Sequence, residues 1–183
     1  MSYPPALTAT LSRWSKLAGV VVDVRGHGRE DLFENVDVTR TVGLFMTIYP
    51  LSLPCRPEWS SRELVSSVKG RRREVPHRGL GYGLLRHGNQ AAELAEIPPA
   101  QVDFNYLGQV DLVLKRQTRL GLAEEAMGPE QSPWRVAPYS LAVTIAVLDG
   151  RLQVRWAQQS DPEIAQSLSE RFVECLRELI RGA

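Results

Sequence analysis

The sequence predicts an α/β fold in which amphipathic helices pack on a β-sheet. Apolar residues recur at helical spacing near both ends of the chain, over 4–18 and 161–182, and this spacing is typical of helices that bury one face. Between them lie short runs rich in β-branched residues, the clearest being a hairpin over 141–156 with Asp149-Gly150 at its turn. Because Asp-Gly suits the tight turn of a hairpin, this segment predicts two paired antiparallel strands.

Length and composition favour a single domain over residues 1–183. With 43% hydrophobic residues the chain can bury a sizeable core. Lysine and arginine total 22 against 21 acidic residues, so there is no overall field to attract nucleic acid or an anionic membrane. No apolar run reaches the ~18 residues of a membrane span. We expect a cytoplasmic protein without nucleic-acid or membrane partners, and two inert cysteines in a reducing compartment.

The first half of the chain predicts a helix over 4–18, stopped by Gly19, and then a strand over 20–24. A second strand is expected over 43–53, and Pro50 places it at a sheet edge or a bulge. Because side chains alternate across a strand, the first strand should carry Val20, Val22 and Val24 on one face and Asp23, Arg25 and His27 on the other.

Ser60 and Glu63 have the spacing of a capping box and predict the start of the next helix. The basic run 71–73 falls near the end of that helix, where the dipole favours cations, so we interpret it as a solvated helix terminus rather than a nucleic-acid patch.

The second half of the chain predicts a strand over 102–107 and an irregular glycine- and proline-rich stretch over 115–138. The strand over 141–148 is apolar on both faces, so we expect burial on both sides. Asp161 should cap the last helix, with Pro162 in its first turn and Gly182 as its stop.

Four segments resemble signature motifs of nonribosomal peptide synthetase epimerization domains, and they occur in the family's order. They are GHGRE at 26–30, DVTRTVG through IYP at 37–50, PHRGLGYGLLR at 76–86 and FNYLGQ at 104–109. One short match would be weak, but four in register indicate the family. The chain resembles the C-terminal half, or second lobe, of such a domain.

The resemblance implies a fold and a site. The family domain is a V of two lobes, each like chloramphenicol acetyltransferase, with the active site in the tunnel between them. This chain would form one half-fold, a mixed, mainly antiparallel sheet flanked by helices. The first lobe's H-H-x-x-x-D-G motif is absent from the sequence. An excised fragment, a naturally split protein and a relic are all compatible with that expectation.

Inverting a Cα centre requires two groups that handle protons, one on each side of the carbon. In the family these are a histidine of the first lobe and the glutamate that precedes Gly-His-Gly. Here that position is Arg25, and a guanidinium has no lone pair with which to act as a base. Arg25 is therefore a disabled catalytic position, an anion clamp or an ordinary salt-bridge partner of Asp23. Glu30 is a nearby carboxylate, but it would need a changed loop to serve as the base.

Three further residues lie in the resembling segments and are candidate site residues, whether vestigial or active. His27, between two glycines, either holds the loop or takes part in catalysis. Asn105 and Tyr106 match family residues near the reacting centre, and strand alternation allows at most one to face a shared tunnel unless a bulge intervenes. Asn105 could instead satisfy backbone groups, and Tyr106 could instead be a core residue.

The histidines and cysteines lack metal-ligand spacing, so no metal site is predicted. The resemblance implies no dissociable cofactor, because the substrate arrives on the phosphopantetheine arm of a peptidyl carrier protein. Three functions remain open. The chain is a non-catalytic lobe that contacts a carrier protein or synthetase module, the active half of a split epimerase completed by a separate N-terminal lobe, or a self-associating scaffold that forms a homodimer.

Overall fold

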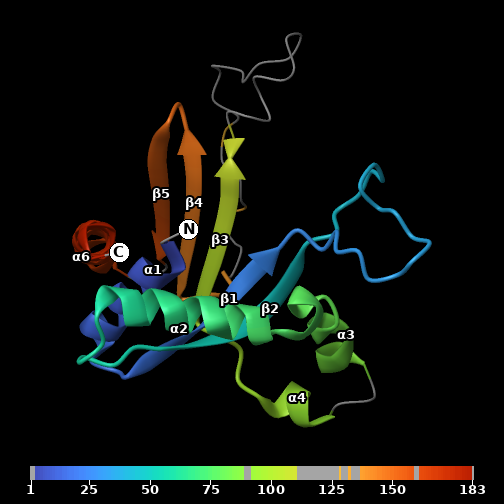
Figure 1. The fold of residues 1–183 in the computed structure, drawn as a ribbon, viewed down its shortest axis with the longest axis horizontal. Helices are drawn as coiled ribbons and strands as arrows, with labels where there is room; N and C mark the ends of the chain where they lie inside the picture. The colour runs from blue at the N-terminus through green and yellow to red at the C-terminus, as the bar shows by residue number, and fades with distance from the viewer. Residues whose placement is uncertain are drawn as a thin grey trace.

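A computed structural model describes residues 3–88, 92–110, 128, 132, 137–158 and 161–182. Five strands form one sheet: β1 (Gly19–Gly26), β2 (Thr47–Pro54), β3 (Val102–Gln109), β4 (Leu141–Leu148) and β5 (Arg151–Gln158). The helices are α1 (Tyr3–Ser15), α2 (Ser61–Glu74), the 3-10 turn η1 (Pro76–Gly79), α3 (Tyr82–His87), α4 (Ala92–Glu96) and α6 (Pro162–Arg181). Figure 1 shows this arrangement.

The strand order is β2-β1-β3-β4-β5. The outer pairs β1/β2 and β4/β5 are antiparallel, whereas β1/β3 and β3/β4 are parallel. The expected mixed sheet is confirmed, but its pairings among the described strands divide equally between the two kinds instead of being mainly antiparallel. Parallel neighbours need long crossover connections, and the segments before and after β3 are long enough to provide them.

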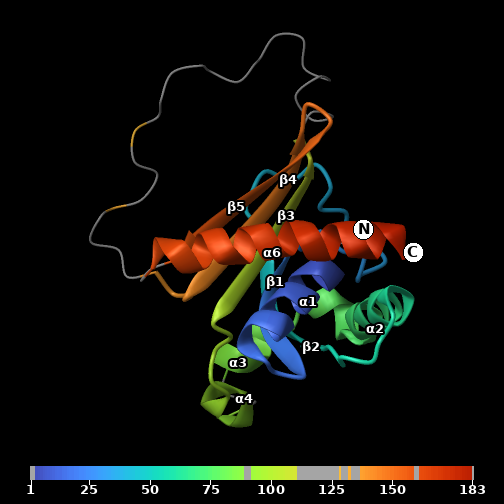
Figure 2. The same ribbon diagram turned by 90° about the vertical axis from the view of Figure 1, so that its left-hand side faces the viewer.

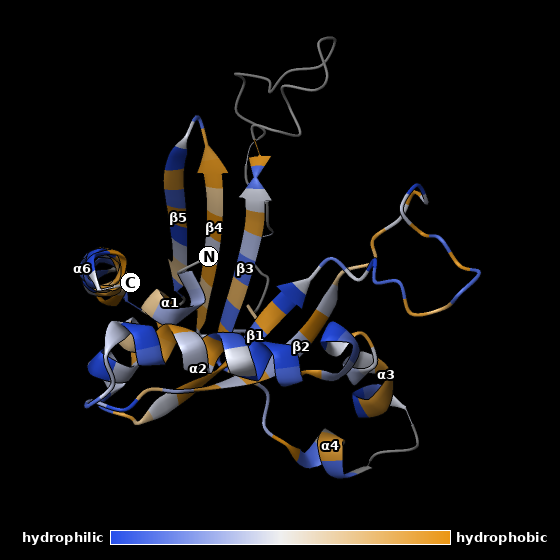
Figure 3. Cartoon of the chain, viewed as in Figure 1, coloured by the Kyte–Doolittle hydropathy of each residue, from blue (hydrophilic) through white to orange (hydrophobic). Residues whose placement is uncertain are grey.

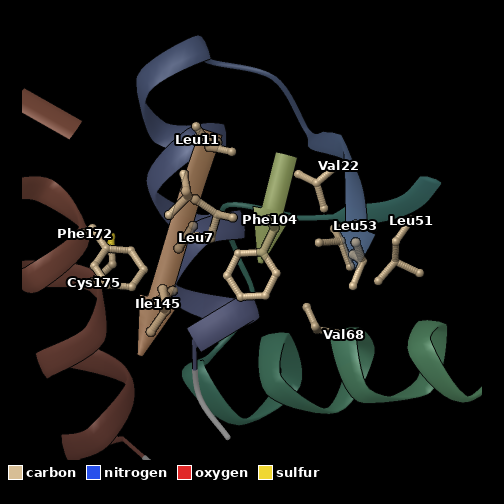
Figure 4. Close-up of a cluster of buried hydrophobic side chains, with 14 of the residues drawn as sticks. Leu7, Leu11, Val22, Leu51, Leu53, Val68, Phe104, Ile145, Phe172 and Cys175 are labelled. Atoms are coloured by element: carbon tan, nitrogen blue, oxygen red, sulfur yellow. The ribbon is translucent and has the colours of Figure 1, made fainter. Parts of the chain in front are cut away.

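Helices α1, α2 and α6 pack on one face of this sheet (Figures 1 and 2). The strands contribute Val22, Phe104, Val143 and Ile145 to the core beneath them. The apolar side of α6 faces α1 and the sheet (Figure 3), and it brings Phe172 and other buried residues into the same cluster (Figure 4). Each large side chain buried in this way contributes about 1.5–3 kcal/mol, so this face holds the fold together.

The local predictions for the first half are largely confirmed. Helix α1 ends at Ser15, earlier than expected, where Lys16 turns the chain with a φ of 60°. Strand β2 begins at Thr47 and not at Gly43, and it occupies the sheet edge that Pro50 predicted. The capping box forms, because Ser60 Oγ accepts from the Glu63 amide and the Glu63 carboxylate accepts from the Ser60 amide at 2.8 Å.

In the second half, the turn between β4 and β5 has φ values of 50° at Asp149 and 69° at Gly150, as the hairpin prediction requires. Strand β4 alternates between buried and half-buried residues, so the expectation of burial on both faces was wrong. Its small residues Ala142 and Ala146 lie on the half-buried face. Most of the predicted irregular stretch 115–138 lies outside the described residues. None of the described helices combines the length and apolar character that a transmembrane span requires.

Candidate functional site

Arg25 and His27 of the first strand and its loop meet Asn105 and Tyr106 of the FNYLGQ segment at one cavity of about 520 Å³. It lies between the start of α1, α2, the ends of β1 and β3, and the loop before β2. Its floor is apolar and comes from core residues such as Val24, Leu53 and Phe104. Polar or charged residues from two distant segments also line it: Arg25, His27, Arg29, Asn105 and Tyr106. The structure therefore brings together four of the five predicted site residues.

Arg25 forms an ion pair with Asp103 of the neighbouring strand. Its Nε donates to both carboxylate oxygens, at 2.8 and 3.1 Å, and Asp103 is only 4% exposed. The hydrogen bond from Arg25 to Asp103 raises the pKa of the guanidinium, against partial burial, which lowers it. Arg25 is thus a permanent cation with a committed partner. Of the three alternatives for Arg25, the salt bridge to Asp23 does not form: the partner is Asp103, which lies beside Asp23 in the parallel register of β1 and β3.

Asp23 has a different partner. The Tyr139 hydroxyl donates to Asp23 Oδ2 at 3.0 Å. Burial raises the pKa of Asp23, the neighbouring Asp103 carboxylate adds to that rise, and the Tyr139 hydrogen bond opposes it. Burial and the Asp23 contact in turn raise the pKa of Tyr139 to about 12. The two carboxylates that lie side by side in the sheet are therefore satisfied by different groups, a guanidinium and a phenol.

His27 and Glu30 belong to one network. His27 Nδ1 accepts from the Arg29 amide at 3.0 Å, so a neutral imidazole carries its proton on Nε2, which lies 3.3 Å from Glu30 Oε1. The other oxygen of Glu30 pairs with Arg78 Nη1 at 3.0 Å. This network ties the GHGRE loop to the PHRGLGYGLLR segment, and it occupies Glu30 with a cation and a histidine. Glu30 does not line the large cavity.

Arg29 and Gly28 hold the first part of the loop after β1 against the segment that leads into β2. The Arg29 guanidinium donates to the carbonyls of Val38 and Gly43, the latter at 3.1 Å, and lies 4.3 Å from the centre of the Phe45 ring. Gly28 has a φ of 66°, and a Cβ there would stand 1.6 Å from the Phe45 carbonyl oxygen. Only glycine fits this close approach, which gives a physical reason for the second glycine of Gly-His-Gly.

Asn105 and Tyr106 both line the cavity at the end of β3. By strand alternation Tyr106 lies on the helix-covered face with Phe104, and Asn105 on the face with Asp103. The Tyr106 ring packs against Tyr3 with 5.2 Å between centroids, and burial raises the pKa of its hydroxyl. The pairing of β3 with β4 shifts register between Tyr106 and Gln109. A strand irregularity of the kind considered from the sequence therefore lies directly after Asn105 and Tyr106.

Sequence reasoning missed four residues that organise this region: Arg29, Arg78, Asp103 and Tyr139. Asp103 had a readable signal, because an acid between Val102 and Phe104 in an apolar strand requires a cation or donor when buried. Tyr139 lies in the segment before β4, and no sequence pattern around it indicated a functional role.

His27 and His77 lie far apart in the sequence but line one small hollow with Glu30 and Arg78.

Comparisons with known proteins agree with this description. A family model of the condensation domain matches residues 5–183. The chain is 35% identical over 182 residues to one of the linear gramicidin synthase proteins of Brevibacillus parabrevis, covering 96% of this chain and 2% of that protein. It is 37% identical over 180 residues to chondramide synthase cmdD of Chondromyces crocatus, covering 95% of this chain and 4% of that protein.

Solved structures give the same result. The epimerization domain from the third module of tyrocidine synthetase B superposes with a TM-score of 0.83 at 26% identity, covering 98% of this chain and 41% of that one. The first condensation domain of the calcium-dependent antibiotic synthetase shares the fold, with a TM-score of 0.63 at 21% identity, and the match covers 96% of this chain and 38% of that one. The chain thus spans less than half of a solved domain and a few per cent of the synthetases. It belongs to the condensation-domain family of nonribosomal peptide synthetases, and within it corresponds to the C-terminal lobe of an epimerization-type domain.

Proposed function

We propose that this chain is a degenerate second lobe of an epimerization domain, unable to invert a residue itself, that contacts a peptidyl carrier protein or a synthetase module. The observation that carries the proposal is the ion pair of Arg25 with buried Asp103. Arg25 stands where the family has its second-lobe glutamate. A guanidinium there can stabilise a negative charge but cannot remove a proton.

The neighbouring carboxylates offer no substitute base. Asp103 is paired with Arg25, Asp23 accepts from Tyr139, and Glu30 is held by Arg78. Each would have to give up a partner before it could take a proton from a substrate, and Asp103 would leave Arg25 without its counter-ion in a half-buried site. The site geometry therefore supports binding rather than proton transfer.

A deuterium wash-in experiment tests the proposal. An aminoacyl carrier protein is incubated in heavy water with the chain, and deuterium at the α-carbon is measured by mass spectrometry. We expect no incorporation above that of carrier alone. Incorporation by the unmodified chain would overturn the proposal.

A second arm supplies the N-terminal lobe of a related epimerization domain as a separate protein. The variant Arg25→Glu/Asp103→Asn introduces a carboxylate at the family position without placing it beside a second buried charge. We expect exchange with this variant and none with the unmodified chain. Exchange with the unmodified chain plus the added lobe would instead establish the active half of a split enzyme.

Exposed apolar side chains around the cavity mouth favour docking to another lobe as a second candidate function. Leu44 is 87% exposed, and Val42, Met46 and Leu107 also present apolar surface. Such a patch marks an interaction surface or drives self-association. Light scattering of the chain with and without the added lobe tests this candidate, and a monodisperse monomer that neither binds the lobe nor a hydrophobic dye would count against it.

A further inference from the structure

Strand β5 forms an open edge of the sheet. Among the described strands it pairs with β4 on one side only. Its eight residues pair with β4 without a register shift, and they include no proline or glycine. The opposite edge, β2, carries Pro50 and Pro54, and proline interrupts the row of backbone donors that a further strand would need. Unlike β2, β5 can therefore accept another strand along its whole length.

The turn between β4 and β5 fixes which backbone groups of β5 point outward. In a hairpin with a two-residue turn, the flanking residues, here Leu148 and Arg151, exchange hydrogen bonds, and bonded and non-bonded pairs then alternate along the ladder. Leu152, Val154 and Trp156 therefore direct their amide and carbonyl groups away from β4. Their side chains are half-buried on the helix-covered face. The edge thus offers a partner strand both backbone groups and apolar side chains.

Helix α6 carries a partly exposed apolar stripe next to this edge. Val173 is 40% exposed and Ile180 is 64% exposed, and their spacing of seven residues places them on one side of the helix. Cys175 and Glu178 contact Arg13 of α1 from the other side, so the stripe is turned away from α1. Figure 1 shows α6 end-on beside β5, and Figure 2 shows it crossing in front of β5 and β4. The stripe and the open edge therefore lie at the same border of the molecule.

We propose that this border binds a second copy of the chain, with the two β5 strands antiparallel across a two-fold axis at Val154. Each strand then presents the same surface to the other, as a two-fold interface requires. Leu152 of one copy faces Trp156 of the other on the helix-covered side. The outward amide and carbonyl groups of these residues complete a ladder that joins the two sheets.

Charge selects this register over its neighbours. Centred on Val154, the pairing puts Arg151 of one copy opposite Ala157 of the other. It also puts Gln153 opposite Arg155. A register centred on Gln153 would oppose Arg151 to Arg155, and one centred on Arg155 would oppose that residue to itself. Because like charges directly opposite one another destabilise a sheet, the register at Val154 is favoured.

The same axis brings the two α6 helices together. Each α6 packs against its own β5, so pairing the strands sets the helices antiparallel on one face of the joined sheet. Val173 lies near the middle of α6, and Glu170 and Arg177 flank the stripe on either side of it. In an antiparallel pair centred there, the carboxylate of one copy faces the guanidinium of the other. No residue of β5 or α6 lines the large cavity, so the dimer does not rest on the function proposed above.

Sedimentation equilibrium of the full chain tests the interface. We expect a reversible monomer–dimer equilibrium in the micromolar range. Gln153→Glu places a carboxylate opposite Arg155 in both symmetric pairs and should lower the dimer Kd about threefold to tenfold, whereas Gln153→Arg should raise it by a similar factor. A chain that stays monomeric at millimolar concentration, or equal effects of the two variants, would overturn the proposal.

A helix variant with a matched control separates this interface from other self-association. Val173→Glu should raise the dimer Kd about tenfold or more. Ser167→Glu adds the same charge at another exposed position of α6 and should leave the Kd unchanged, and the urea midpoint shows whether both remain folded. Leu44→Glu at the cavity mouth should also leave it unchanged. A dimer that survives Val173→Glu but is lost in Leu44→Glu would assign self-association to the cavity mouth and contradict this interface.

Discussion

Arg25 Nε lies 2.8 Å from Asp103 Oδ1 although 78 residues separate the two in the chain. The pair joins β1 to β3 across a parallel register, and it places a cation where the family carries a glutamate. Its energetic role and its chemical role can be tested separately.

Breaking this pair should destabilise the fold. Arg25→Ala leaves the Asp103 carboxylate, 4% exposed, without its cation, and loss of one partner of a buried pair costs about 3–5 kcal/mol. Arg25→Met combined with Asp103→Leu should cost less than Arg25→Ala, because no charge is left buried. Urea unfolding measures both, and the exposed Arg151→Ala provides the control, with a change within about 0.5 kcal/mol. Equal losses for the Arg25 and Arg151 variants would contradict a supporting role for the pair.

Gly28→Ala should disrupt the loop between β1 and β2, which contributes Leu44 and Phe45 to the cavity lining. The added Cβ would meet the Phe45 carbonyl oxygen at 1.6 Å, and the φ of 66° disfavours alanine as well. Gly70→Ala is the matched control, because a Cβ there meets nothing within 4 Å on helix α2, and alanine should stabilise that helix by about 0.5–1 kcal/mol. Hydrogen exchange of residues 27–46 together with the unfolding midpoint distinguishes the two. Opposite signs of stability change are expected, and a stabilising Gly28→Ala would show that the loop does not pack as described.

Tyr139 should titrate late and link stability to alkaline pH. Burial and Asp23 raise its pKa from 10.0 to about 12, so the native state holds the phenolic proton more tightly than the unfolded state does. The resulting stability is complete below pH 10 and is lost as the pH rises through the native pKa. Absorbance at the tyrosinate band should show that a late-titrating group is lost in Tyr139→Phe, whereas Tyr106, whose pKa burial also raises, should titrate late in both proteins. The Tyr139→Phe variant should lose less stability over this range. A wild-type titration superimposable on that of Tyr139→Phe would refute the contact.

Ser60→Ala should shorten or fray α2. The hydroxyl accepts from the Glu63 amide and its backbone amide donates to Glu63, so alanine removes one half of the box, at a cost of about 1 kcal/mol. Ser66→Ala lies within the same helix at an exposed position and should be neutral or slightly stabilising. Circular dichroism and urea unfolding compare the two variants, and identical midpoints would mean that the cap adds no stability.

Much of the local structure could be predicted from the sequence, because helix caps and tight turns depend on residues close together in the chain. The capping box at Ser60, the Asp149-Gly150 turn, the Asp161 cap of α6 and the edge position indicated by Pro50 all depend on neighbours within a few residues. The four motifs likewise indicated the family before any coordinates. The start of β2 was misplaced because Arg29 bonds to the Gly43 carbonyl and keeps that segment in a loop, a contact between residues 14 apart.

Tertiary structure alone decided which charges meet. Alternation put Asp23 and Arg25 on one strand face and left a salt bridge between them as one alternative, but with β1 aligned beside β3 Arg25 pairs with Asp103, and Asp23 accepts from Tyr139. Two cysteines that look unrelated in the sequence come to lie around Arg13, whose guanidinium reaches Cys175 at 3.4 Å. Strand order and register depend on how all five strands and their helices bury apolar surface together. A local sequence pattern does not contain this information.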